Sequence, residues 1–185
     1  MNGFYLLTGG PGSGKSTLLA ALAAAGHACA PEVARPLIRE QLASGGDLTP
    51  WGDVRGFAVA CRERMLAQLA ALEGRGPCFF DRGLPDLDGY LAHRGFAAAP
   101  EADRGAARRY RRLAFIAPPW REIFVNDPER PQTWTEAGQL DRHLRAAYRD
   151  RGFTLCVLPR APVAERVAFV EATLAQAETF SPWPN

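Results

Sequence analysis

An apolar run is followed by the segment Gly9-Gly10-Pro11-Gly12-Ser13-Gly14-Lys15-Ser16-Thr17. Its spacing matches the complete pattern Gly-x-x-x-x-Gly-Lys-Ser/Thr of a phosphate-binding loop, or P-loop. The glycines allow successive backbone N–H groups to point inward at phosphate oxygens, and the helix that follows directs its positive end at the same anion. Strand, loop and helix occur in the order that the motif requires, which favours a nucleotide site over a glycine-rich turn without a ligand.

Length, charge and cysteine usage limit the class of protein. With 185 residues and a formal net charge of +2, the chain suits one domain over residues 1–185, and we expect no nucleic-acid partner. The longest apolar stretch, 18–30, is too short to span a membrane, and no signal peptide is recognisable. The four cysteines form neither a CxxC pair nor a zinc spacing, which is typical of buried free thiols in a cytoplasmic protein.

Short β-like runs alternate with longer helical runs along the chain. We expect strands at 3–8, 27–31, 78–80, 122–125 and 154–158. We expect helices at 16–25, 33–43, 50–72, 85–93, 102–115, 136–149 and 163–177. Thr49 and Pro50 should cap and start the third of these helices. The alternation predicts an α/β fold, a three-layer α/β/α sandwich around a five-stranded parallel sheet.

Parallel sheets bind ligands at the carboxyl ends of their strands, so residues that follow the predicted strands should meet beside the P-loop. These residues are Glu32, Asp81, Asn126-Asp127 and Pro159-Arg160. A lid is expected within residues 94–135. Arg104, Arg108 and Arg112 recur every four residues in the predicted helix 102–115, and we interpret most of that basic face as solvated.

The P-loop alone does not define a reaction, because kinases, GTPases and motors share it. Lys15 is the only lysine of the chain, so the Asn/Thr-Lys-x-Asp motif that recognises guanine is absent. The chain is also too short to add the helical lid domain of an AAA+ machine. A small phosphotransferase and a small ATP-binding switch remain.

Several segments outside the P-loop resemble known families. Glu32 and Asp81-Arg82-Gly83 resemble the acidic and Asp-Arg elements of deoxynucleoside and thymidylate kinases. The whole chain resembles the small predicted ATPases described as an "AAA domain" family, which are related to the ribosylnicotinamide kinase domain of bacterial NAD-biosynthesis proteins. This resemblance rests on the segments 31–35, 80–86, 118–120 and 127–130. It implies a kinase-like fold but does not fix a substrate.

We expect the nucleotide side of the site to bind ATP and Mg²⁺. Lys15 should neutralise the β- and γ-phosphates, and Ser16 should offer its hydroxyl to Mg²⁺ together with Asp81. The remaining nucleotide contacts are assigned to Gly10, Pro11, Gly12, Ser13, Gly14 and Thr17. The kinase resemblance adds Arg160, at a position where such kinases pack the adenine.

The acceptor side of the expected site holds two candidates for the general base, Glu32 and Asp81, which the sequence does not rank. Arg35 and Arg82 are the candidates for holding the substrate, since a guanidinium forms forked hydrogen bonds with anions and hydroxyls. Arg130 is the catalytic candidate from the lid. The structural alternatives are a surface turn with an ion pair for Asp81-Arg82 and a helix-terminal acid for Glu32.

Two acids of the segment after Arg82 are interpreted mainly as structural. Asp86 and Asp88 suit the first turn of a helix, and only Asp86 is a weak candidate for a substrate contact.

Two functions follow from these assignments. The first is an ATP-dependent kinase of a small nucleoside- or nucleotide-like acceptor. The second is an ATPase or nucleotide-gated module that acts on a protein partner. The sequence leaves a homodimer open and does not identify the acceptor.

Overall fold

The apolar runs form a parallel sheet in the computed structural model, which describes residues 3–97, 102–125 and 132–180. Within these residues the strands lie in the order β2-β3-β1-β4-β5, and every neighbouring pair is parallel. Their bounds are Phe4–Thr8 (β1), Ala28–Ala30 (β2), Cys78–Asp81 (β3), Tyr110–Ile116 (β4) and Thr154–Val157 (β5). The predicted five-stranded parallel sheet is confirmed for the described part of the chain.

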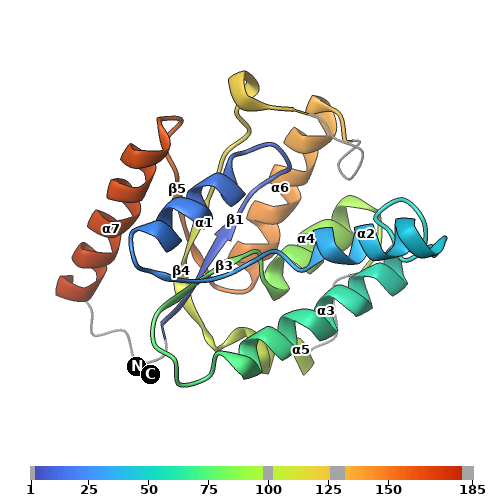
Figure 1. The fold of residues 1–185 in the computed structure, drawn as a ribbon, viewed down its shortest axis with the longest axis horizontal. Coiled ribbons are helices and arrows are strands. Elements are labelled where there is room, and N and C mark those ends of the chain that lie inside the picture. Colours follow the sequence, from blue (N-terminus) through green and yellow to red (C-terminus); the bar gives the residue numbers. More distant parts are fainter. Residues whose placement is uncertain (1–2, 98–101, 126–131, 181–185) are drawn as a thin grey trace.

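Helices cover both faces of this sheet (Figure 1). One face carries α1 (Lys15–Ala24) and α7 (Val163–Phe180), which contact each other. The other face carries α2 (Ala34–Ser44), α3 (Val54–Ala71), α4 (Leu84–His93) and α6 (Trp134–Asp150). A short helix, α5 (Ala102–Ala107), precedes β4. The arrangement is the predicted three-layer α/β/α sandwich.

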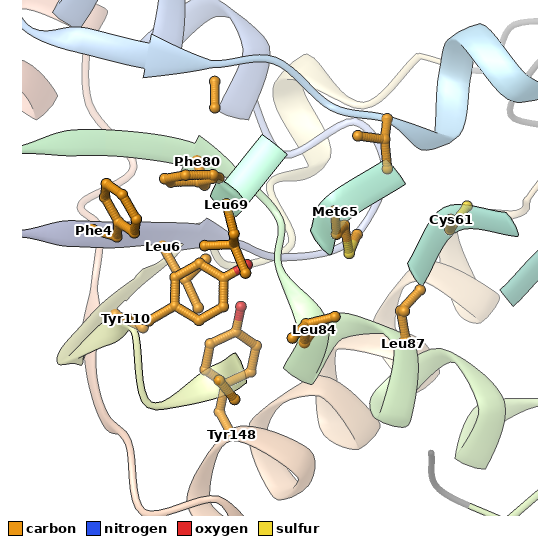
Figure 2. Packing of buried hydrophobic residues seen from close by; sticks show 14 of the residues in the cluster. Phe4, Leu6, Cys61, Met65, Leu69, Phe80, Leu84, Leu87, Tyr110 and Tyr148 are labelled. Carbon is orange, nitrogen blue, oxygen red and sulfur yellow. The ribbon is translucent and has the colours of Figure 1, made fainter. Parts of the chain in front are cut away.

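Alternate side chains of β1 enter the two layers of the core, as the two-residue period of a strand requires. Phe4 and Leu6 pack into a cluster on the side of α2, α3, α4 and α6, part of which is shown in Figure 2. Leu7 points the other way and packs with Leu18 of α1 and Val170 of α7. Strand β1 is therefore buried on both faces, which is typical of a central strand in a parallel sheet.

The predicted fourth strand was wrong. The segment 122–125 does not form a strand; a 3₁₀ turn covers Arg121–Ile123, and Val125 is 73% exposed. The fourth strand is β4, which overlaps the end of the predicted helix 102–115 and pairs with both β1 and β5. Burial on both sides of the sheet outweighs the helix-like spacing of the arginines in this segment.

The predicted basic helix face is absent for the same reason. Arg112 lies on β4, where its Nη1 donates a hydrogen bond to the carbonyl of Arg151 and its guanidinium lies over the ring of Phe153. Arg108 is exposed after the end of α5, and the side chain of Arg104 lies outside the described residues. Arg108 and Arg112 therefore do not share one helix face.

The start of α3 also differs from the prediction. The helix begins at Val54 rather than Pro50, and its N-cap is Asp53, whose carboxylate accepts a hydrogen bond from the backbone N–H of Gly56. Thr49 is buried and accepts from the N–H of Gly52, so it closes the turn before the helix. Threonine and aspartate side chains both accept hydrogen bonds from the free N–H groups at the start of a helix. The sequence therefore did not show whether Thr49 or Asp53 is the N-cap.

Two other expectations have different outcomes. The lid predicted within residues 94–135 includes 98–101 and 126–131, which lie outside the described residues, so it stays a prediction. No helix among the described residues is both long and apolar enough to cross a membrane.

The contact between α4 and α6 depends on a glycine. A Cβ atom at Gly89 would lie 2.9 Å from the Cα of Leu144. We therefore expect Gly89→Ala to lower the free energy of unfolding by about 1–3 kcal/mol, measured by urea denaturation, because the two helices must separate.

Gly138→Ala is the matched control, because a Cβ there, also within a helix, meets no atom within 4 Å. Alanine favours a helix over glycine, so this variant should be as stable as the natural protein or more stable, by up to about 1 kcal/mol. Equal effects at the two positions would contradict the described packing of α4 on α6.

Candidate functional site

The P-loop connects β1 to α1, as the motif requires. Three of its glycines have positive φ angles: 131° at Gly9, 67° at Gly12 and 78° at Gly14. Other residues rarely adopt such angles. The loop is also tightly enclosed, since a Cβ at Gly9 would lie 2.3 Å from the carbonyl oxygen of Ala117. The glycines are therefore required by both backbone conformation and space.

Lys15 lies over this loop and is 3% exposed. Its Nζ donates hydrogen bonds to the carbonyls of Gly9 and Gly10, at 2.9 and 2.8 Å. A third contact, of 3.3 Å, joins Nζ to the hydroxyl of Ser13. The only lysine of the chain thus places a buried ammonium group at the loop.

Ser16 and Asp81 meet where β1 and β3 end. Strand register places Leu7 beside Asp81, and the Ser16 hydroxyl donates to Oδ2 of Asp81 at 3.3 Å. Asp81 is 4% exposed, and its Oδ1 accepts no hydrogen bond from the described residues. Burial raises the pKa of Asp81, while the nearby Lys15 ammonium acts in the opposite direction.

This pair fits the requirements of Mg²⁺. The ion prefers oxygen ligands and is usually held by one or two protein groups together with phosphate oxygens and waters. A hydroxyl and a buried carboxylate with one free acceptor oxygen supply such groups, in Ser16 and Asp81. The described residues contain no cluster of three or more His, Cys, Asp or Glu suited to a metal, but a triphosphate-bound Mg²⁺ does not need one.

Arg82 adopts a strained backbone immediately after β3. Its φ of 73° is the only positive value at a non-glycine residue in the described chain. Strain of this kind costs about 1–3 kcal/mol and is concentrated at functional sites. The N–H of Arg82 donates to the carbonyl of Leu7, and its Nε donates to Oε1 of Glu32, both at 2.9 Å. The turn thus directs the guanidinium toward the end of β2.

The charge of Arg82 is compensated by two carboxylates. Besides Glu32, Oδ1 of Asp86 lies 3.3 Å from its Nη1. Burial works to lower the pKa of Arg82, but Glu32, Asp86 and Asp81 outweigh it and raise that pKa. Both Arg82 and Glu32 have side chains only 13% exposed. The Asp81-Arg82 segment is therefore not the exposed surface turn that was its structural alternative.

Asp86, in the first turn of α4, links this helix to β1 and α6. Its carboxylate accepts hydrogen bonds from the hydroxyls of Thr8 and Tyr148, both at 2.6 Å, and from the N–H of Gly83 at 2.9 Å. These contacts give Asp86 the structural role that the sequence favoured. Asp88 is also paired, with Arg151.

A first pocket opens beside the Arg82 ion pair. Glu32, Arg35, Arg82 and Asp86 form its polar part. Its apolar part is formed mainly by α2, α3 and α4, through Ile38, Phe57, Cys61, Met65, Leu87 and Tyr90. Cys61, Met65 and Leu87 are seen in Figure 2 at the edge of the core cluster. The pocket suits a molecule with an apolar body and a polar end.

A second pocket lies over the P-loop. Its floor is formed by residues 12–17, and its walls are formed by Trp120, Ile123, Val125, Pro162, Val163 and Arg166. Arg35 lines this pocket as well as the first one. The two pockets therefore meet at Arg35, with the P-loop on one side and the Glu32–Arg82 pair on the other.

Most predicted site residues converge here, but not all. Arg160 is exposed and lines neither pocket, whereas its neighbour Pro162 lines the second. Arg130, Asn126 and Asp127 lie outside the described residues. Asn126 and Asp127 were expected at the end of a strand at 122–125, but the fourth strand is Tyr110–Ile116, so they do not follow a strand end.

Sequence analysis missed Arg166. It lies in the first turns of α7 and is 3% exposed, although most charged residues of its helix are at the surface. Its side chain reaches back to the P-loop, where Nη1 donates to the carbonyl of Gly14 at 3.3 Å. The only sequence signal for a role of Arg166 in the site was its position shortly after the last predicted strand.

Comparison with known proteins agrees with this description. The model of the family described as "AAA domain" matches residues 4–166, so the chain belongs to that family. The predicted family is thereby confirmed. A search of curated proteins finds no match.

Solved structures show the same fold. Deoxyadenosine kinase from M. mycoides, with dCMP and dCDP bound, superposes with a TM-score of 0.65 at 12% identity, over 94% of this chain and 99% of that one. The same kinase with dATP gives 0.60 at 13%, over 93% and 99%. Thymidylate kinase from Candida albicans gives 0.62 at 13%, over 96% and 92%. The protein therefore has the P-loop fold of nucleoside and nucleotide kinases.

Gly14 provides a test of the loop. A Cβ there would lie 2.7 Å from Nη1 of Arg166 and 3.1 Å from Cδ1 of Ile123, on a backbone with positive φ. We expect Gly14→Ala to lower the affinity for Mg·ATP at least about tenfold in isothermal titration calorimetry, because the loop and the guanidinium must both move.

Gly45→Ala separates this effect from backbone strain alone. Gly45 also has a positive φ, of 68°, but a Cβ there meets no atom within 4 Å. This variant should lose about 1–2 kcal/mol of stability and keep its affinity. Unchanged affinity in Gly14→Ala would show that the loop does not hold the nucleotide.

Proposed function

We propose that the protein is an ATP-dependent kinase that transfers the γ-phosphoryl group to a hydroxyl of a small nucleoside- or nucleotide-like molecule. The observation that carries this proposal is the meeting of two pockets at Arg35, one over the P-loop and one beside the Glu32–Arg82 pair. A nucleotide-gated module needs only the pocket over the P-loop. The pocket beside the Glu32–Arg82 pair is what a phosphoryl acceptor requires.

On the nucleotide side, the loop amides and Lys15 would bind the triphosphate, and Ser16 and Asp81 would hold Mg²⁺. Bound Mg²⁺ supplies charge neutralisation on the phosphate oxygens. Lys15 must exchange its contacts with the Gly9 and Gly10 carbonyls for phosphate oxygens, which a long, flexible side chain allows.

On the acceptor side, we assign the general base to Glu32. Asp81 already faces Ser16, whereas Glu32 lines the acceptor pocket. As the acceptor oxygen forms its bond to the γ-phosphorus, its proton passes to Glu32, and the bond from phosphorus to the leaving ADP oxygen breaks. Arg82 would orient Glu32 and the acceptor, and Arg35 would stabilise charge between the two pockets.

The charges of the acceptor pocket favour an uncharged hydroxyl compound. Arg82 is already paired with both Glu32 and Asp86, so it offers little net positive charge to a second anion. The apolar walls, which include Phe57 and Tyr90, suit a flat ring such as a nucleobase. We therefore favour a nucleoside-like acceptor over a nucleoside monophosphate.

A screen of ATP consumption tests this proposal, with nucleosides, nucleoside monophosphates and ribosylnicotinamide as acceptors. Asp81→Asn should lower phosphoryl transfer at least about a hundredfold, because the metal loses its carboxylate ligand, and Lys15→Ala should also reduce nucleotide affinity. EDTA should abolish transfer in the natural protein. Asp150→Asn, at an exposed site at the end of α6, is the control.

Two results would contradict the kinase assignment. One is ATP hydrolysis that no acceptor of the panel stimulates, which would favour the ATPase or switch. The other is an unchanged transfer rate in Asp81→Asn.

Glu32→Gln tests the choice of base separately. We expect kcat to fall about 10²- to 10⁴-fold, the usual contribution of a general base, with the dissociation constant for Mg·ATP unchanged. Glu63→Gln, at an exposed position of α3, serves as the control. A kcat within about threefold of the natural protein would remove Glu32 from the proton transfer and leave Asp81 as the candidate.

A further inference from the structure

Arg166 is a buried cation with few partners. It is 3% exposed and lines the pocket over the P-loop. Among the described residues, its one side-chain hydrogen bond runs from Nη1 to the Gly14 carbonyl, at the long distance of 3.3 Å, and its Nε has no hydrogen-bond partner. No ion pair of the described chain includes it.

A guanidinium in this position is costly. Removing a charge from water costs several kcal/mol unless an opposite charge and hydrogen bonds replace the lost hydration. Burial lowers the pKa of Arg166, and no neighbouring carboxylate opposes that effect. By contrast, the side chain of Arg82, which is 13% exposed, has Glu32 and Asp86 beside it. Among the described residues, carboxylates thus compensate the charge of Arg82, whereas no carboxylate lies beside Arg166.

We propose that Arg166 binds phosphate oxygens of the nucleotide and so completes the P-loop site from the last helix of the fold. This inference rests on the nucleotide site of the proposed function. Gly14, which the guanidinium contacts, belongs to the loop whose amides collect anions, and the triphosphate supplies the charge that Arg166 lacks.

The neighbouring side chains favour phosphate over the base as the partner of Arg166. Ile123, Val125 and Val163 are apolar, more than a third exposed, and line the same pocket. These three side chains provide an apolar surface that suits a base. Arg166 is buried against Gly14 itself, where a Cβ would lie 2.7 Å from its Nη1. The glycine at this position therefore also makes room for the guanidinium.

Binding experiments with two probes test the assignment. In calorimetry, Arg166→Gln should weaken both Mg·ATP and Mg·tripolyphosphate, which lacks a base, by about 10- to 100-fold, the usual effect of losing charge-assisted hydrogen bonds. Arg149→Gln, on the exposed surface of α6, should change neither. Equal affinities in the natural protein and Arg166→Gln would overturn the proposal. Weaker Mg·ATP with unchanged tripolyphosphate would also overturn it, since the contact would then be to the base.

Stability separates phosphate binding from a structural role. Arg166→Met keeps an apolar stem without the charge, and the unliganded variant should melt at the same temperature as the natural protein or higher, because an uncompensated buried charge is gone. Its shift in melting temperature on adding Mg·ATP should be smaller. A large drop in the melting temperature of unliganded Arg166→Met would assign the residue to folding and overturn the proposal.

The same data distinguish this inference from the proposed function. If the natural protein bound Mg·ATP and Arg166→Gln bound it equally well, only the role of Arg166 would fail. If the natural protein bound Mg·ATP but phosphorylated no acceptor, the kinase would fail and Arg166 would remain a nucleotide ligand.

Discussion

The site depends on the pairing of β3 with β1. Their parallel register sets Leu7 beside Asp81, so the acid at the end of one strand faces the P-loop that follows the other. The hydrogen bond from Ser16 to Asp81 follows from that register, as does the turn at Arg82, whose N–H is bound by the Leu7 carbonyl. A shift of one residue would turn the Asp81 side chain to the opposite face of the sheet and separate it from Ser16.

Buried charge is distributed unevenly around this strand pair. The Arg82 guanidinium lies between Glu32 and Asp86, and Asp86 is further bound by the hydroxyls of Thr8 and Tyr148, so this network is closed without a ligand. Among the described residues, Asp81 retains a buried oxygen without a hydrogen bond, and Arg166 has no carboxylate beside it. The closed network forms part of the wall of the first pocket, while the polar atoms of Asp81 and Arg166 that lack hydrogen-bond partners among the described residues suit the proposed Mg²⁺ and phosphate ligands. We therefore expect ligand binding to stabilise the protein mainly through Asp81 and Arg166.

The sequence predicted the parts of the fold that local patterns determine. The P-loop motif placed β1 and α1, and the apolar run before Asp81 placed β3. The same patterns predicted that Glu32, Arg35 and Arg82 lie at one edge of the sheet, because the carboxyl ends of parallel strands meet there. Strand β4 was missed because arginines at helical spacing interrupt its apolar pattern, and only pairing with β1 and β5 reveals it as a strand. The burial of Arg166 could not be predicted either, since it arises from contact between the last helix and a loop far away in sequence.

The proposed function, together with the proposed role of Arg166, requires Mg²⁺ and a triphosphate to occupy the space between the P-loop, Asp81 and Arg166. A crystal structure with a non-hydrolysable ATP analogue and Mn²⁺ in place of Mg²⁺ tests it most directly, because Mn²⁺ is located by its anomalous scattering. We expect the anomalous peak beside the Ser16 hydroxyl and the Asp81 carboxylate, with phosphate oxygens within hydrogen-bond distance of Lys15 and Arg166. A metal distant from Asp81, or a triphosphate bound away from residues 9–17, would contradict it.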